Sequence, residues 1–244
     1  MHTIFLAILV VLLAYFVKGF SGFGPALVLV PSLTLLFDPE TAISASTFFD
    51  IIAGPVLLYS VRKQIDWKFV VPVNLLIFTG AYFGAHMLKI VSAGLLTKII
   101  GFGLLGFIVL LLFQSSNESQ KSNPSKLVHW ISLPIALIAG FSGGMIGITG
   151  PLLVIYMKLN FDKSYFRNQL IAIFTFGAIW RFFLYRWNGT AFNMDLWLII
   201  FLSVMLFAGL WIGQHVHARV NEKTFNRVIA LVLIVPVINL LLFK

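Results

Sequence analysis

The sequence contains no cysteine and few charged residues. Only 10% of the 244 residues are charged, whereas 60% are hydrophobic, and the mean hydropathy is +1.00. The absence of cysteine excludes disulfide bonds and thiolate chemistry. The scarcity of charge and the high hydropathy exclude a soluble globular protein and indicate an integral membrane protein.

The hydrophobic residues form long, uncharged runs. Phe69–Leu88, Ile99–Asn117 and Leu196–Ala218 meet or approach the ~20 residues that a spanning helix needs. The runs are continuous and do not alternate with polar residues, so we expect helices and not a barrel. The sequence thus predicts an all-α polytopic membrane protein surrounded by membrane lipid. The expected spans lie near residues 3–37 and 127–160, both interrupted, and near 41–61, 69–89, 95–113, 164–187, 195–216 and 223–243.

The net charge of +9 does not indicate a nucleic-acid partner. The lysine and arginine residues lie in short loops beside apolar runs and form no basic domain. Their distribution instead bears on the orientation of the chain in the membrane.

Two glycine-rich phrases interrupt the longest apolar stretches. They are Gly19-Phe20-Ser21-Gly22 and Gly140-Phe141-Ser142-Gly143, and each is followed by a Gly-Pro pair, Gly24-Pro25 and Gly150-Pro151. Glycine clusters unwind helices, and proline suits the first position of a new helix. Broken backbone at membrane depth is tolerated only inside protein or beside a watery cavity. We therefore expect the two breaks to form the functional site.

The sequence also contains an internal repeat. The polar stretch Gln114–Lys126 separates two halves, which predicts a first repeat at 1–113, a cytoplasmic linker at 114–126 and a second repeat at 127–244. The Gly-Phe-Ser-Gly phrases align at a shift of 121 and the Gly-Pro pairs at 126, which predicts a five-residue insertion near Gly144–Thr149. A shift of 129 aligns five further pairs: Asp66 with Asp195, Gly80 with Gly209, Gly84 with Gly213, His86 with His215, and Lys98 with Arg227.

Positive charges predict the topology of each interrupted stretch. If each stretch crosses the membrane once, the lysines and arginines divide evenly between the two sides. If each stretch enters and returns as a hairpin, eleven of the 17 fall on one side and five on the other, with Lys18 left out because it lies beside a break. The positive-inside rule therefore favours hairpins, with cytoplasmic loops near 62–68, 117–126, 158–167 and 219–223 and both termini outside.

Each half is then an interrupted helical hairpin followed by three spanning helices. The odd number of full crossings makes the halves inverted repeats, an architecture of many secondary transporters. The charge count leaves open whether the interrupted stretches are re-entrant hairpins or pairs of full spans.

We expect a small anion to be held at the midplane of the membrane, between the two Gly-Pro helix starts. The first N–H groups of a helix have no intrahelical partner, and the helix dipole adds partial positive charge there. This chemistry needs no cofactor and no metal. The alternative is that the glycines only permit tight helix crossing. The predicted substrate-binding residues are Lys18, Ser21, Gly22, Phe23, Gly24, Pro25, Ser142, Gly143, Gly144, Thr149, Gly150 and Pro151.

Three charged residues lie inside expected spans. Asp50 lies in the middle of an expected span. A charged carboxylate is energetically costly at this depth, so its presence there indicates a functional role by default. It either carries a coupling proton or forms a structural ion pair with Lys18 or Arg181. Arg181, the second coupling candidate, either faces a cavity or anchors the helix at the interface. Lys18 either adds positive potential to the anion site or extends its stem toward the interface.

The remaining polar residues suit structural roles better. We expect His86 and His215 to pack near span ends, and Asp66 and Asp195 to cap helices. Gln169 either lines the site or packs. The tryptophans are expected in an interfacial belt, notably Trp67, Trp187 and Trp197.

The paired Gly-Phe-Ser-Gly and Gly-Pro segments, one set per half, resemble those of the sulfite exporter TauE/SafE family of membrane transporters. The resemblance covers nearly the whole chain. It implies a secondary transporter of a small sulfur oxyanion or organosulfonate, such as sulfite or sulfoacetate, in a bacterial cytoplasmic membrane, and no enzymatic activity. The extra residues Gly144–Thr149 make the halves unequal. Proton coupling and a homodimer stay open.

Two other functions remain as alternatives. A passive anion channel would use the same binding site. The residues Gly140, Ser142, Gly143 and Gly147 also fit the Gly-x-Ser-Gly-x-x-x-Gly pattern of rhomboid-type intramembrane proteases, with His215 as the base. The repetition of the phrase in both halves argues against the protease.

Overall fold

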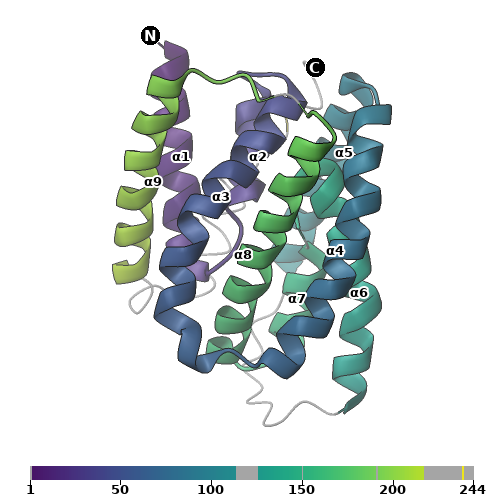
Figure 1. Ribbon diagram of the computed structural model, residues 1–244. Helices are drawn as coiled ribbons and strands as arrows, with labels where there is room; N and C mark the ends of the chain where they lie inside the picture. Colours follow the sequence, from purple (N-terminus) through teal and green to yellow (C-terminus); the bar gives the residue numbers. More distant parts are fainter. Residues whose placement is uncertain (1, 114–125, 150, 191, 217–237, 239–244) are drawn as a thin grey trace. The chain divides into compact units, whose positions relative to one another are not determined.

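The computed structural model describes residues 2–113, 126–149, 151–190, 192–216 and 238 (Figure 1). The described residues contain helices and no strand. The elements are α1 (His2–Ser21), α2 (Pro25–Thr34), α3 (Pro39–Val61), the 3-10 helix η1 (Arg62–Gln64), α4 (Trp67–Ile90), α5 (Ala93–Phe113), α6 (Lys126–Ile146), α7 (Pro151–Asn160), α8 (Lys163–Trp187) and α9 (Leu196–Val216).

The helices agree closely with the expected spans. Five of the described helices, α1, α3, α4, α8 and α9, are long and apolar enough to cross a membrane. The protein is therefore an all-α polytopic membrane protein. The linker at 114–125 and the expected span at 223–243 lie outside the described residues.

Aspartates begin four of the helices. The Asp66 and Asp195 carboxylates accept the amide N–H two residues later, at 3.1 and 2.8 Å. Asp38 and Asp162 accept the amide three residues later, at 2.9 and 3.2 Å. Carboxylates at these positions satisfy N–H groups that have no intrahelical partner. The predicted capping roles of Asp66 and Asp195 are confirmed.

The chain forms two compact units. The first unit comprises Met1–Ser46, Val91–Glu118 and Ala191–Lys244, and the second comprises Thr47–Ile90 and Ser119–Thr190. Each unit combines segments from both predicted repeats: α1 packs on α9 in the first unit, and α4 packs on α6 in the second (Figure 1). The predicted repeat boundaries are a property of the sequence and stay a prediction.

In the second unit, glycines bring α4 and α6 into backbone contact. A Cβ added at Gly80 would collide with the Leu137 carbonyl, and one at Gly84 with the Phe141 carbonyl. A Cβ at Gly144 would collide with the Ala81 carbonyl. The residue numbers rise together along both helices, so α4 and α6 run parallel. Small residues allow this close approach in lipid.

In the first unit, α1 and α9 make the same contacts. A Cβ at Gly209 would collide with the Leu12 carbonyl, one at Gly213 with the Phe16 carbonyl, and one at Gly19 with the Leu210 carbonyl. Positions on α9 correspond to positions on α4 at the predicted shift of 129. Positions on α1 correspond to positions on α6 at a shift of 125.

This register corrects the predicted alignment of the breaks. The shift of 121 that superposes the two Gly-Phe-Ser-Gly phrases is wrong by four residues, because Gly19 has the contacts of Gly144 and not those of Gly140. The Gly-Pro pairs keep their shift of 126. The shift rises from 125 on α6 to 126 at the Gly-Pro pair, so the second copy is longer by one residue between the end of α6 and Pro151. The predicted five-residue insertion near Gly144–Thr149 is wrong.

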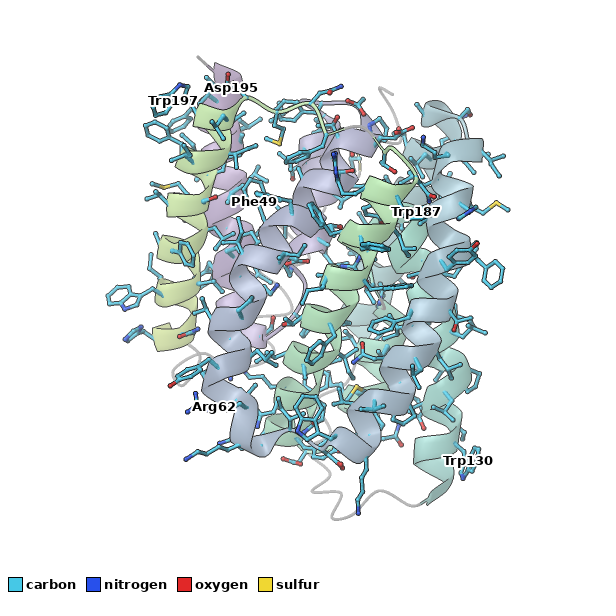
Figure 2. All side chains as sticks on the ribbon, in the orientation of Figure 1. Phe49, Arg62, Trp130, Trp187, Asp195 and Trp197 are labelled. Atoms are coloured by element: carbon cyan, nitrogen blue, oxygen red, sulfur yellow. The ribbon has the colours of Figure 1, made fainter. Side chains whose placement is uncertain are left out.

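The second interrupted stretch is a hairpin, as the charge count predicted. Since α6 runs parallel to α4, it enters from the end of the unit where α4 begins. The chain returns to that end after α7, where the Phe161 ring lies 5.3 Å from the Phe69 ring. Figure 2 shows Arg62 and Trp130 at this end of the second unit and Trp187 at the other.

The second arm of each interrupted stretch is short. Both α2 and α7 have 10 residues, which is about 15 Å of helix and about half of the hydrocarbon thickness. Neither arm can cross the membrane as a helix. Ala81, which faces Gly144, lies about 21 Å along α4 from Trp67, so the second break lies well inside the span.

Polar side chains form hydrogen bonds between the α3–α4 connection and the start of α8. The Gln169 amide accepts the Asp66 N–H at 2.9 Å and donates to the Gln64 carbonyl at 3.0 Å. The Tyr165 hydroxyl donates to the second Asp66 carboxylate oxygen at 2.9 Å. Gln169 is fully buried by these contacts, so the packing interpretation of this residue is correct.

The tryptophans lie exposed at helix ends. Trp187 ends α8 and Trp197 stands in the first turn of α9, with 78% and 71% of their surface exposed (Figure 2). Trp67 begins α4 and is half exposed. These positions suit the predicted interfacial belt.

Candidate functional site

Left-handed glycines end the first arm of each hairpin. After α1, Gly22 has φ 83° and Gly24 has φ 89°; after α6, Gly147 has φ 73°. Residues other than glycine rarely adopt these angles. The Gly22 N–H donates to the Lys18 carbonyl at 2.8 Å, and the Gly147 N–H donates to the Gly143 carbonyl at 3.0 Å. Gly22 and Gly147 are therefore equivalent, again at a shift of 125.

The unwinding predicted at Gly140–Gly143 is wrong. These residues belong to α6, and the helix continues to Ile146. Gly140 and Gly144 instead face α4, where a side chain would collide with its backbone. Gly19 has the same role on α1. For these three glycines the alternative of tight helix crossing is correct, and the breaks begin at Gly22 and Gly147.

A serine hydroxyl braces each break. The Ser21 Oγ lies 2.7 Å from the Phe23 carbonyl and accepts the Phe23 N–H at 3.2 Å. The Ser142 Oγ lies 3.2 Å from the Ile148 carbonyl. Phe23 and Ile148 correspond at the shift of 125, so the two serines support equivalent loop residues from positions one helical turn apart.

A buried arginine of α8 lies at the second break. The Arg181 Nη1 donates to the Thr149 hydroxyl, and a Cβ added at Gly143 would lie 3.3 Å from this nitrogen. Arg181 is only 2% exposed, and its Nε has no hydrogen-bond partner among the described residues. The arginine thus faces the protein interior and is not an interfacial anchor.

A tyrosine one turn beyond this arginine fixes the end of α6. The Tyr185 hydroxyl lies 3.0 Å from the Gly143 carbonyl and 2.8 Å from the Gly144 carbonyl, and its ring is buried. Tyr185 is not among the residues predicted from the sequence. The available signal was the spacing of four from Arg181, which places both side chains on one face of α8.

Asp50 lies at the level of this break. The Phe48 and Phe182 rings are 6.1 Å apart, and a Cβ at Gly54 would lie 2.7 Å from the Thr175 side chain. α3 and α8 therefore run antiparallel, and Asp50 falls beside the turn of α8 that ends at Arg181. Asp50 is 6% exposed. No three metal-ligating side chains gather in the part of the chain that the structure describes.

The family model of the sulfite exporter TauE/SafE matches residues 7–240. The chain belongs to this family. Searches of curated proteins and of solved structures found no match. TauE/SafE proteins are transporters and not enzymes, so this chain is an integral membrane protein for the transport of a small anion.

The first break of this TauE/SafE protein carries a different cation. Lys18 is 3% exposed, and its ammonium lies 5.7 Å from the centre of the Tyr15 ring. At the shift of 125, Lys18 corresponds to Gly143. In the second unit the space beside Gly143 is taken by Thr149 and by the Arg181 guanidinium. Within the described part of the chain, each break thus has one buried cation, Lys18 of α1 or Arg181 of α8.

The predicted site residues fall into two groups. The first unit brings together Lys18, Ser21, Gly22, Phe23, Gly24 and Pro25. The second unit brings together Ser142, Gly143, Thr149 and Arg181, with Pro151 at the start of α7. Gly150 lies outside the described residues. A single anion shared by both breaks stays a prediction.

The protease alternative has no support at Ser142. Its hydroxyl lies 3.0 Å from the Ala139 carbonyl and bonds main-chain oxygen, not an imidazole. His215 packs at 4.5 Å on the Trp211 ring, as His86 packs at 4.7 Å on the Tyr82 ring. Both histidines are exposed, and their Nδ1 atoms contact the carbonyl four residues earlier, which agrees with the predicted packing role.

Proposed function

We propose that this protein is a secondary transporter that moves a sulfur oxyanion or organosulfonate across a bacterial cytoplasmic membrane, and that the second break holds the anion. The observation that carries the proposal is Arg181, a buried guanidinium whose Nε has no hydrogen-bond partner among the described residues. A charge in the membrane interior is costly unless it meets an opposite charge. A bound oxyanion would supply the acceptor that the Arg181 Nε lacks among the described residues.

The donors at the break fit an oxyanion. Arg181 offers N–H groups in a planar fork, which matches the oxygens of sulfite or a sulfonate. Thr149 adds a hydroxyl beside the fork. α7 begins at Pro151, so the amides of its first turn have no intrahelical acceptor and the positive end of its dipole points to the break. Gly143 has no side chain and so lets Thr149 and the Arg181 guanidinium lie directly against α6.

Coupled transport is favoured over a passive channel by Asp50. A buried carboxylate at the level of the arginine can take up a proton when the anion binds, whereas a channel needs no such group. We propose that Asp50 carries the coupling proton. Replacement by asparagine should then leave anion binding intact and abolish accumulation driven by a pH gradient.

The proposal is tested by ligand-induced thermal stabilisation of the purified protein with sulfite, sulfate and sulfoacetate. The wild type should be stabilised by its substrate, and Arg181→Gln should lose this stabilisation. Arg186→Gln is the matched control, because Arg186 lies on the same helix but is exposed. Equal stabilisation of folded Arg181→Gln and wild type would show that the anion does not bind at this arginine.

A further inference from the structure

Four hydroxyl groups in the first half of α3 are buried without a hydrogen bond. Thr41, Ser44, Ser46 and Thr47 are all at least 94% buried. None of the four side-chain oxygens meets the geometry of a hydrogen bond among the described residues, although the Thr47 hydroxyl lies close enough to the Tyr185 hydroxyl to interact with it. A buried hydroxyl without a partner is costly, so four in one segment require an explanation.

Other hydroxyls of the same protein show what the default is. In a membrane helix, Ser and Thr normally donate to the carbonyl four residues earlier. For Ser44, Ser46 and Thr47 that carbonyl lies within α3, yet no such bond is formed. The bond is present, at 2.6–2.9 Å, for Ser21, Thr34, Thr79, Thr97, Thr175 and Ser203.

The hydroxyls lead along α3 to Asp50. Thr41, Ser44, Thr47 and Asp50 are spaced by three residues, and neighbours at this spacing have Cβ atoms about 5–6 Å apart. One water molecule can bridge two oxygens at such a separation, since each hydrogen bond takes up about 2.8 Å. We infer that this row, Thr41–Ser44–Thr47, is hydrated and conducts protons to Asp50.

The row begins at the N-terminal end of α3 and stops at Asp50, near the middle of the helix. Thr41 lies in the first turn, beside the capping Asp38, whereas η1 at the other end belongs to the loop predicted to be cytoplasmic. The row therefore predicts proton access from the non-cytoplasmic side. On α8, which contacts this part of α3, the ionisable groups near the level of Asp50 are Arg181 and Tyr185. A proton on Asp50 would thus change the charge beside the proposed anion site.

The inference rests on the proposed function, and proteoliposomes separate the two. Sulfite exchange at equal pH tests anion transport, and sulfite accumulation driven by a pH gradient tests the row. Thr41→Val combined with Ser44→Ala should slow driven accumulation about tenfold and leave exchange intact. Thr97→Val combined with Ser203→Ala is the control, because these hydroxyls already bond their own helices.

Each outcome has one meaning. Driven accumulation at the wild-type rate in the α3 variant, or accumulation driven by sodium and not by protons, would overturn the row. Absence of sulfite exchange in the wild type would instead count against the proposed substrate.

A labelling experiment tests hydration without transport. The chain has no native cysteine, so Ser44→Cys can be treated with a small, impermeant methanethiosulfonate from the non-cytoplasmic side. We expect Ser44→Cys to react and the equally buried Thr97→Cys not to react. A folded Ser44→Cys protein that does not react would overturn the hydrated row.

Discussion

The α1–α9 pair of the first unit and the α4–α6 pair of the second unit share one contact pattern. Glycines at positions 209 and 213 approach α1 as Gly80 and Gly84 approach α6, and Gly19 faces α9 as Gly144 faces α4. Each pair is parallel and ends in a left-handed glycine, Gly22 or Gly147. The scaffold around each break is thus the same.

The polar groups at the two breaks differ. The position of Lys18 in the first unit is Gly143 in the second, where Thr149 and Arg181 occupy the space. Tyr15 replaces Gly140, and no glycine contact with α9 forms there. The two helix pairs therefore share one backbone arrangement, while the buried cation described at each break comes from a different helix.

The largest effect is expected where the glycines touch backbone. Gly84→Ala and Gly213→Ala each place a Cβ against a carbonyl of the facing helix, which cannot move aside as a flexible side chain can. Each should lower the free energy of unfolding by about 3 kcal/mol. The measurement is the yield and melting temperature of the purified protein.

Gly103→Ala on α5 is the control, since nothing lies within 4 Å of its added Cβ. If only one of the variants Gly84→Ala and Gly213→Ala is destabilised, the two helix pairs are not equivalent.

A smaller effect, confined to binding, is expected at Gly143. The added methyl of Gly143→Ala meets the Thr149 hydroxyl and the Arg181 guanidinium. Displacement of this charge-assisted donor should weaken sulfite binding about 30-fold, with a smaller loss of stability. Calorimetric titration gives the affinity, with Gly106→Ala as the control. Wild-type affinity in Gly143→Ala would remove the second break from the binding site.

Among the described residues, a tyrosine that bonds the end of the first arm is found only at the second break. The capping residues Asp38 of α3 and Asp162 of α8 correspond at a shift of 124. At this shift Tyr185 corresponds to Val61 on α3, which has no hydroxyl. Tyr185→Phe removes the bond to the Gly143 and Gly144 carbonyls and should cost about 1–2 kcal/mol of stability. The exposed Tyr82→Phe is the control in thermal unfolding. Equal melting temperatures for both variants would mean that the brace contributes nothing.

The smallest effects are expected at the serines. Ser21→Ala and Ser142→Ala should each cost about 0.5–1.5 kcal/mol of stability and change anion affinity little, since both hydroxyls serve the main chain. Thermal unfolding and titration of both variants check this. A large loss of affinity in either variant would return that hydroxyl to the anion site.

The sequence predicted the helices and the aspartate caps well because these depend on local signals. Asp66 and Asp195 match without a gap, and apolar runs of span length are hard to mistake in a membrane chain. The hairpin followed from charges in the loops. In contrast, the register of the breaks was mistaken by four residues. One helical turn is close to four residues, so the shifted phrases still present similar faces.

The site could be predicted only in part. The Gly-Pro restarts were identified from sequence, but the approach of Arg181 to Thr149 joins residues 32 positions apart and depends on the packing of α8. Ser44 and Thr47 looked like ordinary small residues of a membrane helix. Only the structure shows that their hydroxyls lack the bond to their own helix.

The most direct test of the account is the position of a bound oxyanion at Arg181. A crystal structure with selenite, a heavier analogue of sulfite, would locate the anion by anomalous scattering. We predict a selenium peak at the second break, with selenite oxygens within hydrogen-bond distance of the Arg181 Nε and the first amides of α7. A bound selenite elsewhere, with the Arg181 Nε still unpaired, would contradict it.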